Sequence, residues 1–398
     1  MRKTLTLSII TVIALNGANI DEAFKSGKAS GQLRTVYLSQ DNAIDTDTYG
    51  TSLGGILKYE SGEWNGLKLG VAAYISQKVG FATGDEAKAN NDLFANNAQS
   101  YAYVGEAYAD YTMGDLNLKI GRQLLDTPFA QTDDIRMHPN TFEAAIATYS
   151  GWDKTTLIGG YVKRFAGYDS GDDISKFKRF DGFDSKGVTV LGIMNESIEN
   201  FKAQGWMYGI DNMANAIYAD AIYSLPLSET MGLELSAQAA NFSEKSGSGL
   251  DGNVYGIATA FNYSALRLSA AYNTSSSDNG KVISNGFGGG PYFTSMEEMT
   301  IDGYEDAKAC QLSAELDLAD AGIEGLKLSG QYGTFKSTPM DIKVKEVDFI
   351  ATYAINEALS AEMSYAMVND KNKNTFDNNG TPDDGGYDRL LVRLSYNF

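Results

Sequence analysis

The carboxy-terminal stretch Tyr387-Asp-Arg-Leu-Leu-Val-Arg-Leu-Ser-Tyr-Asn-Phe398 alternates between apolar and polar residues. Successive side chains of a β-strand point to opposite faces, so the stretch predicts a strand with one apolar face and one polar, charged face. The apolar face holds Leu390, Val392, Leu394, Tyr396 and Phe398, and the other face holds Arg389, Arg393, Ser395 and Asn397. A chain that repeats this pattern many times and ends on it is typical of a barrel that spans an outer membrane.

The composition is compatible with one large barrel. The chain has 398 residues with 42 Gly, 24 Tyr and 18 Phe but only 6 Pro, as tight turns and aromatic membrane belts require. The formal net charge of -19 makes nucleic acid a poor partner and indicates hydrated acidic loops. With Cys310 as the only cysteine and His138 as the only histidine, neither an intrachain disulfide nor a Cys/His zinc site is expected.

The amino terminus predicts a signal peptide. Met1-Arg2-Lys3 is basic, an apolar run follows from Leu5 to Leu15, and small residues come next, so we expect a signal peptide at 1–18 and a single barrel domain at 19–398. The alternative is a short buried strand. No apolar run approaches the ~20 residues of a membrane-spanning helix. In a membrane, only a closed barrel would then satisfy the backbone of this chain.

Alternation and turn residues predict an all-β, antiparallel up-and-down barrel of about 18 strands. The segments are 29–38, 53–60, 67–77, 101–113, 116–122, 143–150, 155–164, 187–196, 200–210, 215–224, 231–242, 252–263, 265–275, 308–318, 324–335, 344–354, 358–368 and 387–398. Long and short connections alternate between them, which is typical of a membrane barrel with both termini on the short-turn side. The second face of each segment is polar, which indicates a wet interior and no packed core.

Three stretches carry a resemblance to a known family. The longest is Leu118-Lys-Ile-Gly-Arg-Gln-Leu-Leu-Asp-Thr-Pro-Phe-Ala-Gln-Thr-Asp-Asp-Ile-Arg-Met-His-Pro-Asn-Thr-Phe142, in the third long connection. The others are Glu22-Ala-Phe-Lys-Ser-Gly-Lys-Ala-Ser-Gly-Gln-Leu-Arg34 and Gly289-Gly-Pro-Tyr-Phe-Thr-Ser295. Together with the last strand they resemble the OprD-type outer-membrane porins, also called outer-membrane carboxylate channels, over essentially the whole mature chain.

The resemblance implies an 18-stranded monomeric barrel in the outer membrane of a Gram-negative bacterium. It implies passive diffusion of small, water-soluble solutes, carboxylate-bearing or zwitterionic, without a cofactor. It also implies that the third extracellular loop, at 123–142, folds inward and narrows the pore. Outer-membrane lipids and lipopolysaccharide surround such a barrel, and Phe398 would be read by the barrel-assembly machinery.

Strand parity sorts the charges that face the lumen, where charged side chains set selectivity. The basic residues predicted to line the solute path are Arg34, Lys68, Lys119, Arg389 and Arg393. The inward acids are Glu234, Glu315, Asp317, Glu346, Asp348 and Glu362, and the constriction loop would add Asp126, Phe129, Asp133, Asp134 and Arg136. We expect one basic and one acidic wall, with a transverse field at the constriction; the alternative is that these charges merely keep the lumen wet.

Arg122 does not fit strict parity. Alternation from Leu116, Leu118 and Ile120 points it toward lipid, where a charge costs roughly 2–4 kcal/mol at the midplane. Either it lies at the rim, or a bulge at Gly121 turns it inward. The resemblance favours a role in the pore, so we expect Arg122 to line the solute path as well.

The sequence lacks the residue patterns that catalysis or metal binding would need. No G-x-S-x-G is present and His138 has no nucleophile placed beside it in sequence, so neither an enzyme nor a metal site is expected. The acidic segment 369–386 departs from a calcium loop at Thr375 and Thr381, which leaves a loose cation site or a solvated loop. The runner-up function is a structural or adhesive barrel that does not conduct.

Overall fold

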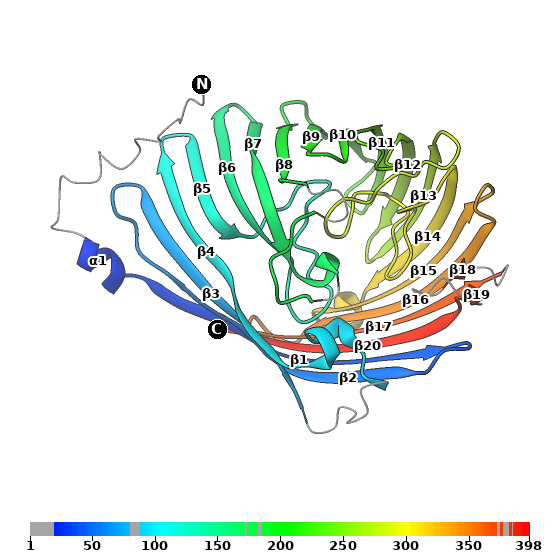
Figure 1. Ribbon diagram of the computed structural model, residues 1–398, viewed down its shortest axis with the longest axis horizontal. Helices are drawn as coiled ribbons and strands as arrows, with labels where there is room; N and C mark the ends of the chain where they lie inside the picture. The colour runs from blue at the N-terminus through cyan, green and yellow to red at the C-terminus, as the bar shows by residue number, and fades with distance from the viewer. Residues whose placement is uncertain are drawn as a thin grey trace.

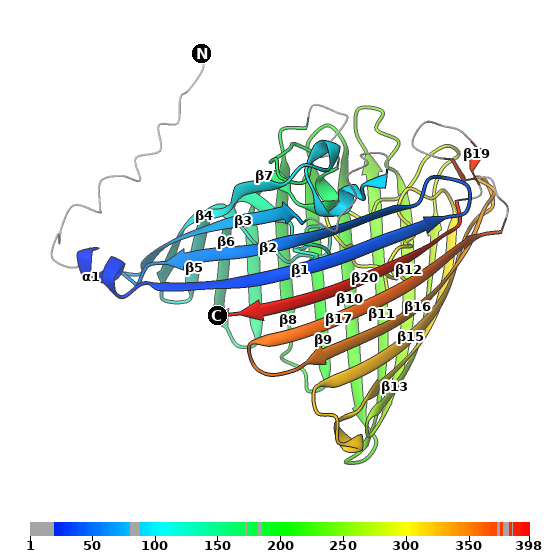
Figure 2. The same cartoon turned by 90° about the horizontal axis from the view of Figure 1, so that it is seen from below.

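One antiparallel sheet of 18 strands closes on itself, because β1 pairs both with β2 and with the last strand, β20 (Figures 1 and 2). The computed structural model describes residues 20–79, 88–171, 173–180, 185–371, 375–376, 382–383 and 385–398. The barrel strands of the first half are β1 (Lys28–Asn42), β2 (Thr48–Glu60), β3 (Leu67–Lys78), β4 (Tyr101–Met113), β5 (Leu116–Gln123), β6 (Thr141–Trp152), β7 (Thr155–Ala166), β8 (Val188–Asn195) and β9 (Phe201–Ile210).

The strands of the second half follow in the same up-and-down order. They are β10 (Ala214–Pro226), β11 (Met231–Glu244), β12 (Gly252–Tyr263), β13 (Leu266–Ser276), β14 (Ala307–Asp317), β15 (Leu326–Ser337), β16 (Ile342–Ala354), β17 (Leu359–Asp370) and β20 (Tyr387–Asn397). The remaining elements are short: α1 (Ile20–Lys25), η2 (Asn91–Leu93), η3 (Asn96–Ala98), η4 (Tyr168–Ser170), η5 (Ala319–Ala321) and the hairpin β18 (Thr375–Phe376) and β19 (Pro382–Asp383). The predicted fold class and strand number are thus confirmed.

Several strands run further than predicted. β1 continues to Asn42 and β2 begins at Thr48, so the first predicted long connection shrinks to residues 43–47. The segment from Ser39 to Asn42 is polar on both faces, which hides a strand from any search for alternation. Ladder hydrogen bonds come from the backbone, however, and Gln40 pairs with both Thr48 and Arg389 across its two neighbours.

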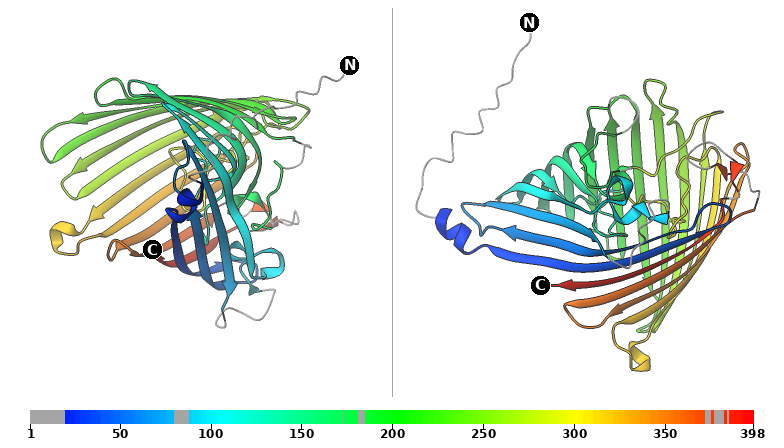
Figure 3. Two further views of the ribbon diagram at one scale, coloured as in Figure 1. Left: turned by 90° about the vertical axis from the view of Figure 1, so that its left-hand side faces the viewer. Right: turned by 60° about the horizontal axis from the view of Figure 1, so that its bottom comes forward.

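A short helix that was not predicted, α1, precedes the first strand. It lies at the short-turn end of the barrel, near the carboxy terminus (Figure 3), and the backbone nitrogen of Gly62 donates to Ala23 at 2.8 Å. The predicted signal peptide lies outside the described residues. Within the described part of the chain, no helix is long and apolar enough to span a membrane.

The outer face is apolar across neighbouring strands. One row runs through the register partners Leu69, Ala109, Ile120, Ala145 and Tyr161, on β3 to β7. Leu69, Ile120 and Tyr161 in this row are all largely exposed. An outward-facing apolar row of this kind on a closed sheet is typical of a surface that contacts lipid.

The interior is polar toward the short turns but packed near the long loops. Phe129, Phe142, Phe165 and Phe180 are buried there and belong to one apolar cluster, with Phe287 packed against it. These side chains come from strands and from three loops, at residues 124–140, 167–187 and 277–306. The expectation of a lumen without a packed core is therefore wrong at this level, because alternation along strands says nothing of what loops place inside them.

Candidate functional site

The third loop (residues 124–140) contacts two opposite walls of the barrel. At one end the ring of Phe129 lies 5.2 Å from Tyr208, 5.7 Å from Tyr218 and 5.3 Å from Phe242, measured between centroids. These partners stand on β9, β10 and β11. At the other end Asp134 reaches Arg34 on β1, nine strands from β10 in the closed order.

Arg34 and Asp134 form a two-point ion pair. Nη1 of Arg34 lies 2.6 Å from Oδ1 of Asp134, and Nη2 lies 2.8 Å from Oδ2. The guanidinium also donates to the carbonyls of Arg136 and Met137 and to Oγ of Ser395. Burial acts to raise the pKa of Asp134, but the hydrogen bonds and charge of Arg34 outweigh it, and the net pKa is lowered. Asp134 is therefore held as a carboxylate.

Arg393, on β20 beside β1, continues the same basic wall. It donates to the backbone carbonyl of Asp134 and forms an ion pair with Glu362 of β17, Nη2 to Oε2 2.7 Å. Since β17 and β20 are neighbours, the predicted basic and acidic walls meet here.

Arg389 lies four residues from Arg393 on the same face of β20, nearer the long loops, and contacts different acids. Its Nη1 lies 2.8 Å from Oε2 of Glu298 and 3.2 Å from Oδ2 of Asp92, in two other loops. Arg136 of the third loop lies 3.4 Å from the second oxygen of Glu298 and stacks over Tyr168 at 4.5 Å. Glu298 thus stands between the buried Arg136 and the largely buried Arg389. Alternation could not find it, because it belongs to a loop without periodicity.

Glu298 is positioned by two acids of β16. Its backbone nitrogen donates to Glu346 at 2.9 Å, Met299 donates to the other oxygen of Glu346 at 2.9 Å, and Glu297 donates to Asp348 at 3.4 Å. Both β16 carboxyl groups are fully buried. They hold the loop at 277–306 (the seventh loop, between β13 and β14) and do not face the open lumen.

The remaining predicted acids have cationic partners on the adjacent strand or on the strand beyond it. Glu234 lies 2.6 Å from Nη2 of Arg267, and Lys327 lies 3.6 Å from Glu315 and 3.9 Å from Asp317. Arg267 on β13 and Lys327 on β15 share the inward parity of the acids. Strand parity could have found both cations, and their presence leaves this wall far less acidic than predicted.

The predicted lysines lie toward the short-turn half. Lys119 of β5 stands 3.9 Å above the ring of Tyr108, and Lys68 is half-buried on the inner face of β3. Lys58 of β2, which the sequence analysis missed, forms an ion pair with Glu106 at 2.8 Å.

Arg122 takes the first of its two predicted placements. The register of β4, β5 and β6 aligns Ala107, Arg122 and Glu143, and it is continuous past Gly121. Ala107 is exposed on the outer face, so Arg122 belongs to that face at the loop end of its strand. Its guanidinium lies 4.3 Å from the ring of Phe177. The expectation that Arg122 lines the solute path is therefore wrong, because the strand keeps its alternation past Gly121.

Two further loop groups are held in unusual surroundings. Burial, and then the charge of Asp169, raise the pKa of Asp133 to about 7. His138 is buried between the hydroxyl of Tyr101 at 2.8 Å and the carbonyl of Gly55 at 3.0 Å, and burial lowers its pKa to about 4. Both ring nitrogens are occupied, so His138 anchors the third loop to the wall.

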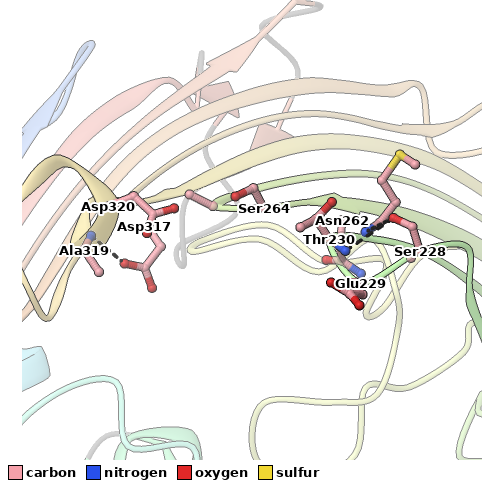
Figure 4. Close-up of a pocket in the computed structure, with 11 residues that line it drawn as sticks. Ser228, Glu229, Thr230, Asn262, Ser264, Asp317, Ala319 and Asp320 are labelled. Carbon is pink, nitrogen blue, oxygen red and sulfur yellow. Dashed lines mark hydrogen bonds between the residues drawn. The ribbon is translucent and has the colours of Figure 1, made fainter.

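Three cavities are lined by residues of the inner wall, the third loop or the short turns. One of about 370 Å³ includes Arg34, Arg393, Lys327 and Glu362 among its lining residues. One of about 320 Å³, against the opposite wall, is lined by Asp126 of the third loop together with aromatic and polar side chains, among them Trp206, Tyr218 and Asp220. The third, of about 530 Å³, lies among the short turns and includes Glu229, Asp317 and Asp320 (Figure 4). A basic and a more acidic chamber therefore flank the third loop.

A closed membrane-spanning barrel with a charged inner cross-section defines a channel-forming outer-membrane protein. Residues 22–398 match the model of the OprD family of outer membrane porins, and the chain belongs to that family. Its place is accordingly the outer membrane of a Gram-negative cell. No curated protein sequence is significantly similar to it.

Solved structures share the fold at low sequence identity. Pseudomonas aeruginosa OccK9 (OpdG) superposes with a TM-score of 0.80 at 18% identity, covering 94% of this chain and 99% of that one. Pseudomonas aeruginosa OpdK, solved with vanillate, gives 0.78 at 16% identity, covering 94% and 99%. Acinetobacter baumannii OccAB3 gives 0.77 at 16% identity, covering 94% and 100%.

Proposed function

We propose that the porin passes small carboxylate-bearing or zwitterionic solutes by passive diffusion, and that the third loop forms its constriction. The supporting observation is the line of Arg34, Arg393 and Arg389 on adjoining strands, with Asp134 and Glu298 brought against it by two loops. Arginine presents a planar fork of donors that matches a carboxylate. A solute carboxylate would exchange with Asp134 and Glu298 on the guanidinium groups as it passes.

The acidic residues near the third loop would set the selectivity for the ammonium group of a zwitterionic solute. Asp126 and Asp220 line the cavity beside Trp206, where an ammonium group would find both a carboxylate and an aromatic face. Structural support from a relative is limited to its printed ligand: the OpdK structure holds vanillate, a carboxylate.

The test is the current through single refolded molecules in a planar bilayer under a salt gradient. Replacing Arg34, Arg389 and Arg393 together by Gln should move the reversal potential toward cation selectivity. Replacing Lys25, Lys28 and Lys154, which are exposed at the short-turn end, removes the same charge away from the constriction and serves as the control. Unchanged selectivity in the arginine variant alone would contradict the proposed solute path.

One observation favours the runner-up, a barrel that does not conduct. Near the long loops, the lumen is filled by an apolar cluster and by ion pairs of Arg34, Arg136, Arg389 and Arg393. A folded barrel that never shows discrete current steps would support this function and exclude the first.

A further inference from the structure

Three lysines stand side by side on the outer face of the barrel. The register pairs Lys308 of β14 with Lys336 of β15, and Lys336 with Lys343 of β16. All three are exposed and share the parity of Leu312, Tyr332 and Phe349, which are exposed apolar residues of the same strands. We call Lys308, Lys336 and Lys343 the lysine row. Cross-strand partners of this kind lie only about 5 Å apart at their Cα atoms.

The row marks the extracellular edge of the lipid-facing band. Lys308 and Lys343 are second residues of their strands, and Lys336 is the last but one of β15, so all three lie where the long loops begin. Lys345 stands one step deeper, 5.8 Å from the ring of Tyr332. Lys371 follows β17 and its backbone nitrogen donates to the carbonyl of Lys343 at 2.8 Å. At this height the headgroups of the outer leaflet begin.

In the part of the chain that the structure describes, the lysine row has no ion-pair partner. No ion pair between described residues includes any of these five lysines. Like charges directly opposite one another destabilise a sheet. The chain as a whole is acidic, with 51 acidic and 32 basic residues. A cluster of lysines without ion-pair partners among the described residues is therefore unusual for it.

A second charged row on the outer face provides the contrast. On β5, β6 and β7, at the same end of the barrel, Arg122, Glu143 and Arg164 are register partners. There Glu143 stands between the cations and forms ion pairs with both Arg164 and Lys163. In that row the carboxylate of Glu143 partly balances the neighbouring cations, whereas the lysine row contains no acidic residue.

We propose that the lysine row binds the phosphate groups of an outer-leaflet lipid of the lipopolysaccharide type. The phosphates would bridge Lys308, Lys336 and Lys343, and the acyl chains would lie on the apolar surface below, over Leu312, Tyr332 and Phe349. Beyond β17, Asp388 of β20 and Asp41 of β1 are register partners of each other. These two acids bound the proposed site on the β20 side. The site is independent of the proposed solute path, since it uses the opposite face of the sheet.

The test measures retention of lipid by the purified, folded porin in detergent. Native mass spectrometry would compare a lipopolysaccharide with phosphorylated lipid A against its dephosphorylated form, in chelator to exclude divalent bridges. The variant K308Q/K336Q/K343Q should retain the phosphorylated lipid at least tenfold more weakly than the wild type. The variant K25Q/K28Q/K154Q loses the same charge at the other end and should bind like the wild type.

Two results would overturn the site: equal retention by the lysine-row variant and the wild type, or equal retention of the two lipids by the wild type. If the triple variant does not fold, K336Q alone, at the centre of the row, and a salt series on the wild type decide the question. Bound phosphorylated lipid should fall steeply with salt, because exposed charges are screened within about 10 Å at 0.1 M salt. Retention that is unchanged by salt would show that acyl packing alone holds the lipid.

Discussion

Arg34 and Asp134 are separated by 100 residues, yet they meet through both terminal guanidinium nitrogens and both carboxylate oxygens. The pair joins the first strand to the third loop, and Arg393 of the last strand donates to the same aspartate. Asp134 thereby connects the third loop to both strands that close the barrel, β1 and β20.

Replacing Asp134 by Asn keeps the shape and removes the charge that balances Arg34. We expect the variant to become several-fold more anion-selective, because a buried arginine is left with neutral acceptors. Reversal potentials under a salt gradient measure the change. D126N removes a loop charge that bonds only Thr132, and it should shift selectivity less. Equal shifts in both variants would show that only the total loop charge matters.

Glu298→Gln should loosen the hold on Arg136 and Arg389 together. Both are nearly buried and share two acids, Glu298 and Asp92, so the variant leaves Asp92 as their one shared carboxylate among the described residues. The expected result is a rise in anion preference and in the residence time of small dicarboxylates, seen as longer current blocks. E324Q, in an exposed short turn, is the control. A reversal potential like that of the wild type would mean that the two arginines do not face the path of ions.

Phe129→Ala should loosen the third loop. The ring contacts three aromatic residues and is buried, and removal of such a side chain typically costs 3–5 kcal/mol. We expect a higher single-channel conductance with larger fluctuations, provided that this loop is the constriction. F129L retains most of the volume and should stay close to the wild type. An unaltered current in F129A would place the narrowest point elsewhere.

The pH dependence of the third loop follows from Asp133. Its pKa is raised to about 7, against about 3.9 for an unfolded chain, so the docked loop binds the proton more tightly than the released loop does. Docking is therefore strongest below pH 4, weakens as the pH rises from about 4 to 7, and is constant above that. Hydrogen exchange of the loop amides, corrected for the intrinsic rate, measures this trend.

His138 contributes the opposite slope, because its lowered pKa makes protonation unfavourable in the docked loop. The difference between the wild type and D133N isolates the aspartate. That difference should narrow as the pH falls from 7 to 4. A difference that does not vary with pH would exclude a titrating Asp133.

Deletion of Phe398 should reduce the amount of folded barrel in the outer membrane. The backbone nitrogen and carbonyl of Phe398 bond to Gly31 at 3.0 and 2.9 Å, and the exposed ring lies on the lipid-facing side. We expect less of the heat-resistant folded form in membrane fractions, and F398Y, which keeps an aromatic terminus, should restore it. Normal levels of the truncated chain would argue against recognition of this residue during assembly.

The sequence predicted the strands well because one rule governs them. Alternation of side chains located 18 strands and placed Arg34, Arg389 and Arg393 on one inner wall, as the register shows. Strict parity points Arg122 outward, as the register shows, whereas the resemblance led us to expect this residue in the solute path.

The loops escaped the same rule. Glu298 and Asp92 reach the basic wall through irregular backbone, and no period in the sequence relates them to Arg389. Glu346 and Asp348 were correctly placed on the inner face, but their partners are backbone nitrogens of a loop. Residue type alone could not distinguish a carboxylate that meets solutes from one that holds a loop.

The contact of Arg34 with Ser395 and Asp134 has a consequence for how the barrel forms. Arg34 reaches Ser395 only when the first and last strands are paired, and its other donors are then occupied by the third loop. Pairing of the first and last strands and docking of the third loop thus complete one set of contacts around Arg34. A chain that closed with this loop outside would bury Arg34 without the carboxylate of Asp134. The ion pair therefore favours the barrel in which the third loop lies inside.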